Sequence, residues 1–407
     1  MTREAPVPSH IAVIGGGRWA RVLTKALCGL VPPSTRITVH SARNAAGMKE
    51  WADSSVGLAQ VEVFPDWPVF TAPCNAAGIV VNAARDHVES AARLIEHGVS
   101  TLVEKPVSTD LGGLQALMKV AEAKAVRLAS AHIFAFAKYL DNFAEAVRSS
   151  GRVLDVEILW EDASREIRHG GEKSYDPGLP VFTDVLPHLV SLLSPLTAGE
   201  PALDGNIEMA DGGAYVRFGL EWSGALCRIA LKRNGERRQR ILRVQTEREV
   251  LTLDFSEEPG TIRVGALEKL AHPGWSERDR PSAQMLTAFL GWASGGPADS
   301  RLGLENALTA CRLSDELMTP YRAKQIECTM AALLSGRADD PDVRYALTEL
   351  LQSAGPLPVA ALEAQIEFLG KAFRSTRGPA RAHEIGRAPS SEVALLEFAT
   401  RNHIEDQ

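Results

Sequence analysis

Thr101-Leu102-Val103-Glu104-Lys105-Pro106 places a carboxylate, an ammonium group and a proline directly after three residues suited to a buried strand. In an α/β sheet, ligands bind at the carboxyl ends of the strands, so Lys105 is expected at the crevice where chemistry occurs. An X–Pro bond becomes cis at modest cost, and Lys105-Pro106 can therefore hold an unusual backbone bend. Glu104 and Lys105 taken alone could equally form a solvated charge pair, and the rest of the chain decides between the two interpretations.

Length and composition set the broad class of the protein. With 407 residues, the chain is long for one hydrophobic core and suits two domains with an appendage. Its hydrophobic content of 45% and charged content of 23% are those of an ordinary globular protein. A net charge of −7 argues against nucleic acid or an anionic membrane as a partner.

Targeting signals and cysteine chemistry point to a reduced compartment. The first ten residues lack the apolar core of a secretory signal, and the longest apolar region, 179–196, contains Asp184 and three prolines, which excludes a membrane span. The five cysteines are scattered, without disulfide or zinc spacing. We therefore expect a cytoplasmic protein with no metal site.

A glycine-rich turn near the start predicts a dinucleotide site. Ile11–Ile14 reads as a buried strand, Gly15-Gly16-Gly17-Arg18-Trp19-Ala20 follows it, and residues 21–30 have helical spacing. In G-x-G-x-x-A between a strand and a helix, Gly15 permits the turn and Gly17 lets the backbone approach a pyrophosphate. We expect Gly15, Gly17, Arg18 and Trp19 to contact the cofactor. The alternative is a turn that binds nothing.

The end of the next strand bears on which cofactor is used. An NAD-specific site usually has an acid after the second strand, but Arg36–His40 is followed by Ser41-Ala42-Arg43-Asn44, and the next acid is Glu50. A hydroxyl and a guanidinium suit a 2′-phosphate, because arginine pairs with phosphate bidentately. Ser41 and Arg43 therefore favour NADP(H) over NAD(H). A merely solvated Arg43 is the alternative.

The next apolar run continues the alternation of strands and helices. Gly78–Asn82 predicts a buried strand with Arg85 and His87 in its connecting loop, and strands and helices alternate as far as Ala131. This alternation predicts a doubly wound parallel sheet, a Rossmann domain spanning 1–131. The expected cofactor contacts at the carboxyl ends of these strands are Asn82, His87, Glu104 and Lys105.

These motifs resemble the glucose-fructose oxidoreductase, inositol dehydrogenase and MocA family, Gfo/Idh/MocA. The resemblance includes Gly15 to Ala20, a helix ending at Gly98, Glu104-Lys105-Pro106, and Asp184-Val-Leu-Pro-His188 for the family's Asp-x-x-x-His. It extends over roughly residues 8–321, about three quarters of the chain.

The resemblance implies roles for three residues. Lys105 would contact nicotinamide and substrate oxygen, His188 would exchange the proton, and Asp184 would orient substrate or imidazole. The roles are chemically sensible, because hydride transfer at a carbonyl needs a proton on oxygen, and histidine titrates near neutrality. The alternative is that Asp184 and His188 have only a structural role, at the start of a helix whose end is capped and whose polar groups are hydrogen-bonded.

The chain also departs from the family pattern. Leu186 stands where a glycine is common, and Pro187 follows it, so we expect the helix to begin near Asp184 or later. Ser191 replaces an acid that many sugar-acting members carry, and the usual Thr-Pro-Asn loop is absent around residues 82–87. A simple hexose or inositol substrate is therefore disfavoured.

The second domain, 132–321, is expected to be α+β with an open, mostly antiparallel sheet. Asn234-Gly235 is a hairpin signal, and 232–240 reads as a solvated basic turn. In the family such a sheet commonly packs on a second subunit, which implies a homodimer or homotetramer. The expected substrate contacts are His132, Arg165, Arg168, His169 and Tyr175.

Residues 322–407 are predicted to be a helical extension. Apolar stripes start near Val343, Leu362 and Ser390, without a catalytic signature. The extension could pack on its own subunit, mediate assembly or bind a partner protein, and we expect the cofactor site to form without it.

The sequence thus predicts an NADPH-preferring oxidoreductase acting on a small polar, cyclic carbonyl, alcohol or imine, in a biosynthetic pathway. A catalytically silent NADP-binding sensor or scaffold of the same fold is the alternative.

Overall fold

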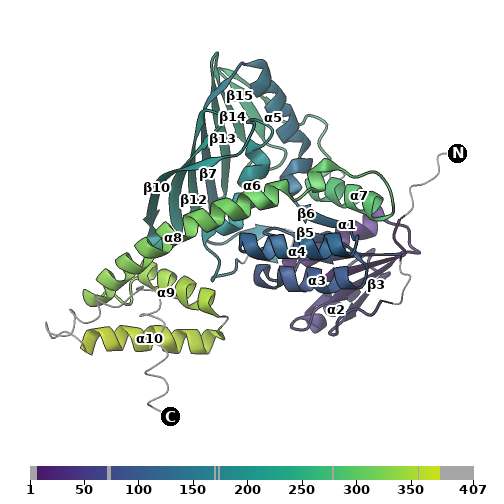
Figure 1. The fold of residues 1–407 in the computed structure, drawn as a ribbon, viewed down its shortest axis with the longest axis horizontal. Helices are drawn as coiled ribbons and strands as arrows, with labels where there is room; N and C mark the ends of the chain where they lie inside the picture. The colour runs from purple at the N-terminus through teal and green to yellow at the C-terminus, as the bar shows by residue number, and fades with distance from the viewer. Residues whose placement is uncertain are drawn as a thin grey trace, which may run out of the picture.

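A computed structural model describes residues 7–70, 75–168, 171–172, 175–276, 279–355 and 357–375. Figure 1 shows a purple-to-blue α/β domain, a teal sheet domain above it, and a green-to-yellow helical extension to one side. His169 and the third apolar stripe, near Ser390, lie outside the described residues, as does the side chain of Arg168. In the part of the chain that is described, no helix is both long and apolar enough to span a bilayer.

The first domain is a six-stranded parallel sheet in the order β3-β2-β1-β4-β5-β6. Central strands such as β4 are buried along their whole length, as a sheet covered on both faces requires. The strand order reverses between β1 and β4, which is where doubly wound sheets open a ligand crevice. The strands are β1 His10–Ile14, β2 Arg36–His40, β3 Val61–Phe64, β4 Ala76–Val80, β5 Ser100–Glu104 and β6 Leu128–Ala131. The helices are α1 Arg18–Leu30, α2 Ala45–Ser54, α3 His87–Glu96 and α4 Leu111–Ala123, with a 3₁₀ turn η1 Ala84–Asp86.

The second domain is an eight-stranded sheet in the order β10-β11-β12-β7-β13-β14-β15-β16. Its pairs are antiparallel except β12 with β7, so the predicted fold class is confirmed. The strands are β7 Val153–Ala163, β10 Ala202–Ala210, β11 Tyr215–Trp222, β12 Ala225–Gly235, β13 Gln239–Thr246, β14 Val250–Asp254, β15 Thr261–Val264 and β16 Leu267–Leu270. The short pair β8 Ile167–Arg168 and β9 Gly171–Glu172 stands apart. Helices α5 Lys138–Ser149, α6 Val181–Leu193 and α8 Glu305–Leu334 are the domain's long helices, and all three contribute to its core.

The hairpin predicted at Asn234-Gly235 is wrong. β12 pairs with β11 and β7, whereas β13 pairs with β7 and β14, so β7 lies between the two strands that the turn joins. Asn234 does have the left-handed φ of 56° that the dipeptide favours. A local turn signal cannot reveal that a strand from earlier in the chain separates its two arms. Ser223-Gly224, with φ of 58° and 78°, does form a two-residue hairpin loop, between β11 and β12.

Two helices cross the predicted domain boundaries. Helix α7 (Pro281–Ala293) returns to the first domain, where Met285 and Phe289 join the core beside Leu23. Helix α8 is thirty residues long and passes through the predicted boundary at 321–322 despite Pro320. Burial of Leu317 and Tyr321 on either side anchors this helix across the proline, so its packing overrides the local break.

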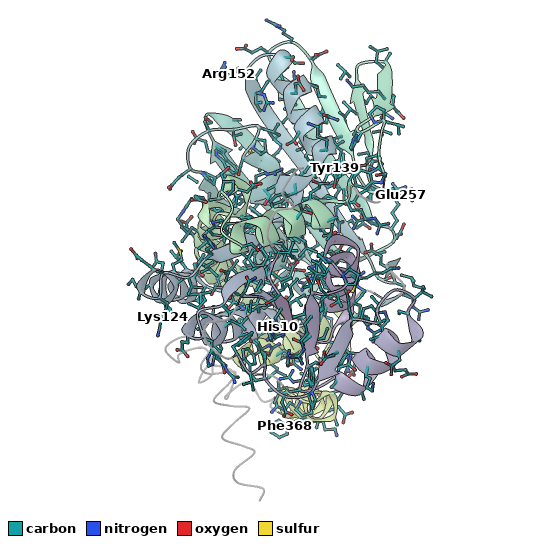
Figure 2. All side chains as sticks on the ribbon, turned by 90° about the vertical axis from the view of Figure 1, so that its right-hand side faces the viewer. His10, Lys124, Tyr139, Arg152, Glu257 and Phe368 are labelled. Carbon is teal, nitrogen blue, oxygen red and sulfur yellow. The ribbon has the colours of Figure 1, made fainter. Side chains whose placement is uncertain are left out.

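The extension continues from α8 into α9 (Pro341–Ala354) and α10 (Val359–Ser375), which coincide with two predicted stripes. Val343, Leu347, Leu362 and Ile366 bury these helices against each other and against Leu333 of α8. Figure 2 shows Phe368 of α10 at the end of the molecule opposite Arg152, which precedes β7. Further short 3₁₀ turns within the described residues are η2 Ile133–Phe136, η3 Asp211–Gly213 and η5 Ser300–Leu302.

Candidate active site

The glycine-rich loop between β1 and α1 leaves space at one glycine only. At Gly15 the backbone has φ of +148°, and an added Cβ would lie 2.7 Å from the Val81 carbonyl oxygen. A Cβ on Gly16 would collide with the Ser41 side chain, a packing role that the motif did not single out. Gly17, the N-cap residue of α1, faces open space. The loop is therefore compact on its inner side and open where a ligand would approach.

The start of α1 suits an anionic group. The helix has no side-chain N-cap hydrogen bond and no acidic residue in its first turn, so no carboxylate of that turn faces its first N–H groups and the positive end of its dipole. Arg18 is its first residue. A pyrophosphate at this position would satisfy those donors. The loop thus fits the group that the sequence predicts.

At the end of β2, polar side chains frame an exposed guanidinium. Ser41 Oγ accepts the Asn44 N–H at 3.2 Å, and Asn44 Nδ2 donates to the Gly16 carbonyl at 2.6 Å. Arg43 is exposed and has no ion pair with any described residue. These bonds fix the loop while leaving the Arg43 charge available for a phosphate.

The loop after β4 is braced from below by His87. This side chain is buried, and Nδ1 lies 2.7 Å from the Pro106 carbonyl and Nε2 lies 3.3 Å from the Asn82 carbonyl. Burial lowers the pKa of His87, which keeps the ring neutral. Asn82 Nδ2 donates to Ser90 Oγ at 2.8 Å, whereas Asn82 Oδ1 is buried without a partner. The side chain of His87 therefore supports the two loops from inside, and Asn82 offers a free acceptor.

Glu104 and Trp19 are bonded to each other. Trp19 Nε1 donates to Glu104 Oε1, and the Lys105 N–H donates to Glu104 Oε2 at 3.0 Å. Burial raises the pKa of Glu104 to about 7, while the Trp19 and Lys105 groups act in the opposite direction. These bonds join α1 to the end of β5. The following Lys105–Pro106 bond is cis, as the sequence allowed.

Lys105 reaches α6 in the second domain. Its Nζ donates to Asp184 Oδ1 at 2.5 Å and to the Asp184 carbonyl at 3.1 Å. The helix begins at Val181, so the expected start near Asp184 is wrong, and Pro187 lies in its interior. Proline removes only the bond to the Thr183 carbonyl, and a thoroughly buried helix tolerates that loss. Asp184 and His188 are the only residues of α6 that are not buried, and they share one face.

His188 lies between aromatic rings. It stacks on Trp160 with ring centroids 5.3 Å apart and meets the edge of Phe134 at 4.9 Å. Burial, followed by the nearby Lys105 ammonium, lowers the pKa of His188 well below its ordinary value. Its Nδ1 is buried and has no hydrogen-bond partner. The imidazole is therefore neutral at neutral pH and can accept a proton.

Two arginines of the segment expected to be solvated are buried instead. Arg233 donates to the Leu179 carbonyl at 2.6 Å, and its Nη2 lies 3.4 Å from Asp184 Oδ2. Arg240 covers the Trp160 ring at 3.8 Å and pairs with Asp162. Alternate residues of β12 face the covered side of the sheet, and Arg233 occupies one of those positions. That alternation in the sequence could have identified it.

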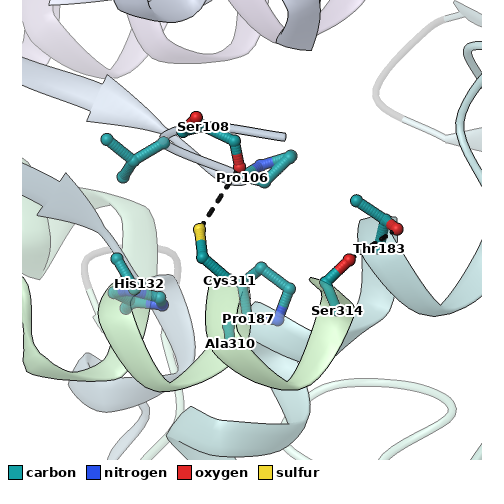
Figure 3. A pocket seen from close by; sticks show the side chains of 10 residues that line it. Pro106, Ser108, His132, Thr183, Pro187, Ala310, Cys311 and Ser314 are labelled. Carbon is teal, nitrogen blue, oxygen red and sulfur yellow. Dashed lines mark hydrogen bonds between the residues drawn. The ribbon is translucent and has the colours of Figure 1, made fainter. Parts of the chain in front are cut away.

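The expected substrate contacts are dispersed. His132 is buried, its Nδ1 lies 3.1 Å from Ser191 Oγ, and burial lowers its pKa to about 4. With Cys311 and Pro187 (Figure 3), it lines a cavity of about 10 Å³, which has room for about one water molecule. Tyr175 lies over the Arg233 guanidinium at 4.5 Å, next to the catalytic candidates. Arg165 is exposed in the loop after β7.

A larger cleft of about 670 Å³ opens between both domains and the extension. Arg85 and Thr109 line it from the first domain, and Arg85 pairs with Asp176 at 2.6 Å. Thr183 of α6 also lines it, together with residues 352–355 at the end of α9. Its volume lies within the range of small-molecule sites. The extension therefore forms one wall of a cleft that α6 lines through Thr183, the residue before Asp184.

The phosphate-binding loop, the lysine at the end of β5 and the facing Asp/His helix define an NAD(P)-binding oxidoreductase. Residues 9–132 match the family described as "Oxidoreductase family, NAD-binding Rossmann fold", GFO_IDH_MocA. The predicted resemblance is thus confirmed by a match over the amino-terminal domain. No curated protein sequence matches the chain.

Solved structures support the same fold beyond the matched domain. A UDP-N-acetylglucosamine 3-dehydrogenase from Acidithiobacillus ferrooxidans is 18% identical with a TM-score of 0.60, over 77% of this chain and 97% of that one. A 3-ketoreductase from Actinomadura kijaniata, solved with NADP and TDP-benzene, is 17% identical with a TM-score of 0.61, over 77% and 97% of the two chains. A dehydrogenase from Clostridium difficile is 13% identical with a TM-score of 0.58, over 76% and 99%. At these identities the likeness establishes the fold alone.

Proposed function

We propose that the chain uses NADP(H) to transfer hydride to or from a small polar carbonyl or alcohol, with Lys105, Asp184 and His188 as its catalytic residues. The observation that carries the proposal is the 2.5 Å contact between Lys105 Nζ and Asp184 Oδ1. It joins the end of β5, where a dinucleotide site opens, to the helix that bears His188. Two motifs 79 positions apart thereby converge on one site.

The cofactor would be held by residues whose geometry suits its parts. The start of α1 and Gly17 would receive the pyrophosphate, Arg43 and Ser41 a 2′-phosphate, and Asn82 Oδ1 a donor of the nicotinamide half. Bound there, the nicotinamide supplies or accepts the hydride. The exposed Arg43, with no acid beside it, is what favours NADPH over NADH.

The chain's own groups handle the charge and the proton. Lys105 carries an ammonium that would leave Asp184 for the substrate oxygen and stabilise the negative charge developing there. His188, neutral in its aromatic setting, would accept the hydroxyl proton during alcohol oxidation and return it during reduction. Asp184 would hold the ammonium in place before substrate enters.

The substrate is proposed to be polar and cyclic. Two of the structurally similar proteins are named a UDP-N-acetylglucosamine 3-dehydrogenase and a 3-ketoreductase, and the first of these names specifies a sugar substrate. Tyr175 and Arg165 lie in the loop region before α6 and remain candidate substrate contacts. An imine in place of the carbonyl would need the same proton and charge.

Kinetics on two variants test the proposal. Lys105→Met and His188→Asn should each lower turnover about 10²–10⁴-fold in an assay of NADPH oxidation with a panel of cyclic ketones and imines, while NADPH affinity stays largely intact. The double variant should lose far less than the product of the single losses, because both groups serve one transition state. Normal turnover in folded His188→Asn would remove its proton-transfer role.

Self-association through the second sheet is part of the same proposal. The outer face carries Arg228, which pairs with Asp155 at 2.6 Å and Glu157 at 3.0 Å, and Arg243, which pairs with Glu157 at 2.8 Å. A homodimer or homotetramer would cover this face. Light scattering on the protein and on Arg228→Glu should show the oligomer and its loss, and a monomeric parent would contradict it.

A further inference from the structure

Arg233 is a buried cation that the hydride-transfer chemistry does not by itself explain. Only 1% of its surface is exposed. Its Nη1 donates to the Leu179 carbonyl at 2.6 Å and lies 3.4 Å from Tyr345 Oη, while its Nη2 lies 3.4 Å from Asp184 Oδ2. The ring of Tyr175 covers one face of the guanidinium at 4.5 Å. A buried charge is retained only when such partners compensate its lost hydration.

Asp184 consequently serves two cations through different oxygens. Lys105 bonds to Oδ1 and Arg233 lies against Oδ2. If Lys105 turns to a substrate oxygen, the carboxylate loses its closer partner. Arg233, which cannot lose its proton and is packed in place, would still hold the carboxylate ionised and in position.

One partner of Arg233, Tyr345, belongs to helix α9 of the extension, and α9 packs against the rest of the protein. A Cβ on Gly178 would lie 2.7 Å from the Gln352 backbone, so α9 packs directly on the loop that leads into α6. Buried Glu349 of the same helix accepts from Arg322 and Tyr321, both at 2.8 Å. Tyr345 thus lies beside Arg233 on a helix that contacts both the loop before α6 and helix α8.

We infer that Arg233 is a positioning residue for Asp184, and that the C-terminal extension, through Tyr345, fixes Arg233 and keeps it out of water. The extension is then part of the catalytic unit and not a separate module. This inference rests on the proposed function for the roles that it gives Asp184 and Lys105.

The chemical reactivity of Lys105 reports this arrangement without a substrate. Its Nζ donates to Asp184 Oδ1 at 2.5 Å, and Arg233 Nη2 lies 3.4 Å from the other oxygen of the same carboxylate. Without Arg233 the carboxylate is held less firmly against Lys105. The Lys105 side chain should then be free for more of the time to react with an acylating reagent.

The test is trace acetylation of the full-length protein at one fixed pH, with Lys105 modification followed by peptide mass spectrometry against exposed Lys49. Arg233→Gln should raise Lys105 modification several-fold relative to Lys49. Tyr345→Ala, which admits water to the guanidinium, should raise it in the same direction by a smaller factor. Arg233→Lys, which keeps the charge, should restore the parental rate.

Leu347→Ala is the matched control, because Leu347 is a buried residue of the same helix that packs within the extension. It should lower the melting temperature and leave the rate of Lys105 modification unchanged. An unchanged rate in Arg233→Gln, or an equal rise in Leu347→Ala, would overturn the inference. If Arg233→Gln does not fold, Tyr345→Ala against Leu347→Ala decides. Labelling needs neither cofactor nor substrate, so its failure is separate from failure of the hydride-transfer proposal.

Discussion

Replacing Glu104 by glutamine should change how the stability of the protein depends on pH. Glu104 is buried at the end of β5, and its pKa is raised by burial from an ordinary 4.5 to about 7. The folded protein therefore binds this proton more tightly than the unfolded chain does. Its contribution to stability is fully present below pH 4.5 and is lost as the pH rises through about 7.

The size of the effect follows from the two pKa values. A difference of about 2.5 units at 1.36 kcal/mol per unit gives about 3 kcal/mol across the whole window. Glu104→Gln cannot titrate at this position. As the pH rises, the parent should therefore lose about that much unfolding free energy relative to the variant. The buried imidazoles His87, His132 and His188 have lowered pKa values and act in the opposite direction, but both proteins contain them and their contribution cancels.

Urea denaturation at a series of pH values measures this difference directly. Glu62→Gln is the control, because Glu62 is an exposed carboxylate whose pKa is lowered by a 2.8 Å pair with Arg36. Its difference curve should be small and of opposite sign. A flat curve for Glu104→Gln would show that the Trp19 and Lys105 donors, not burial, set the ionisation of Glu104, and the electrostatic picture of the β5 end would be refuted.

Three further outcomes check other parts of the site. Arg43→Ala should abolish a preference for NADPH over NADH of at least tenfold, about 1.4 kcal/mol, in fluorescence titrations, and equal affinities in the parent would contradict the assignment. Trp160→Ala should let water reach His188 and move its pKa upward toward the ordinary value in an NMR titration, whereas an unmoved pKa would deny that stacking desolvates the ring. Glu349→Ala should cost about 3–5 kcal/mol of unfolding free energy because it leaves Arg322 buried without its carboxylate, and a loss below about 1 kcal/mol would contradict that pairing.

The α/β half of the fold was predictable because its signals are local. A buried apolar strand, a glycine turn and a helical stripe follow one another in sequence, and parallel βαβ units place them in order in space. The second sheet was predictable as a class but not in its pairing. Asn234-Gly235 is a genuine turn, yet β7 lies between its arms, and a pairing between distant strands leaves no local trace.

The candidate site was likewise predictable only in part. Lys105 and the Asp184–His188 spacing could be found from motif and period, and the structure brings Lys105 and Asp184 into contact. Arg233 was missed because a charged residue in a basic segment reads as solvated, and only the pattern of alternate inward positions along β12 indicates otherwise. The start of α6 was misjudged for a related reason, since burial of the whole helix outweighs the proline rule.

The extension was expected to be dispensable for the cofactor site, and the packing argues for the reverse. A chain ending at residue 321 would cut α8 within its length, remove Glu349 from its bond with Tyr321, and expose Arg233 and the loop at Gly178 to water. The glycine-rich loop lies elsewhere, so any effect on the cofactor must pass through the fold. We expect the shortened chain to melt at a markedly lower temperature or to aggregate, and to bind NADPH weakly for that reason. A shortened chain that melts like the parent and binds NADPH equally well would show that neither the fold nor the cofactor site needs the extension.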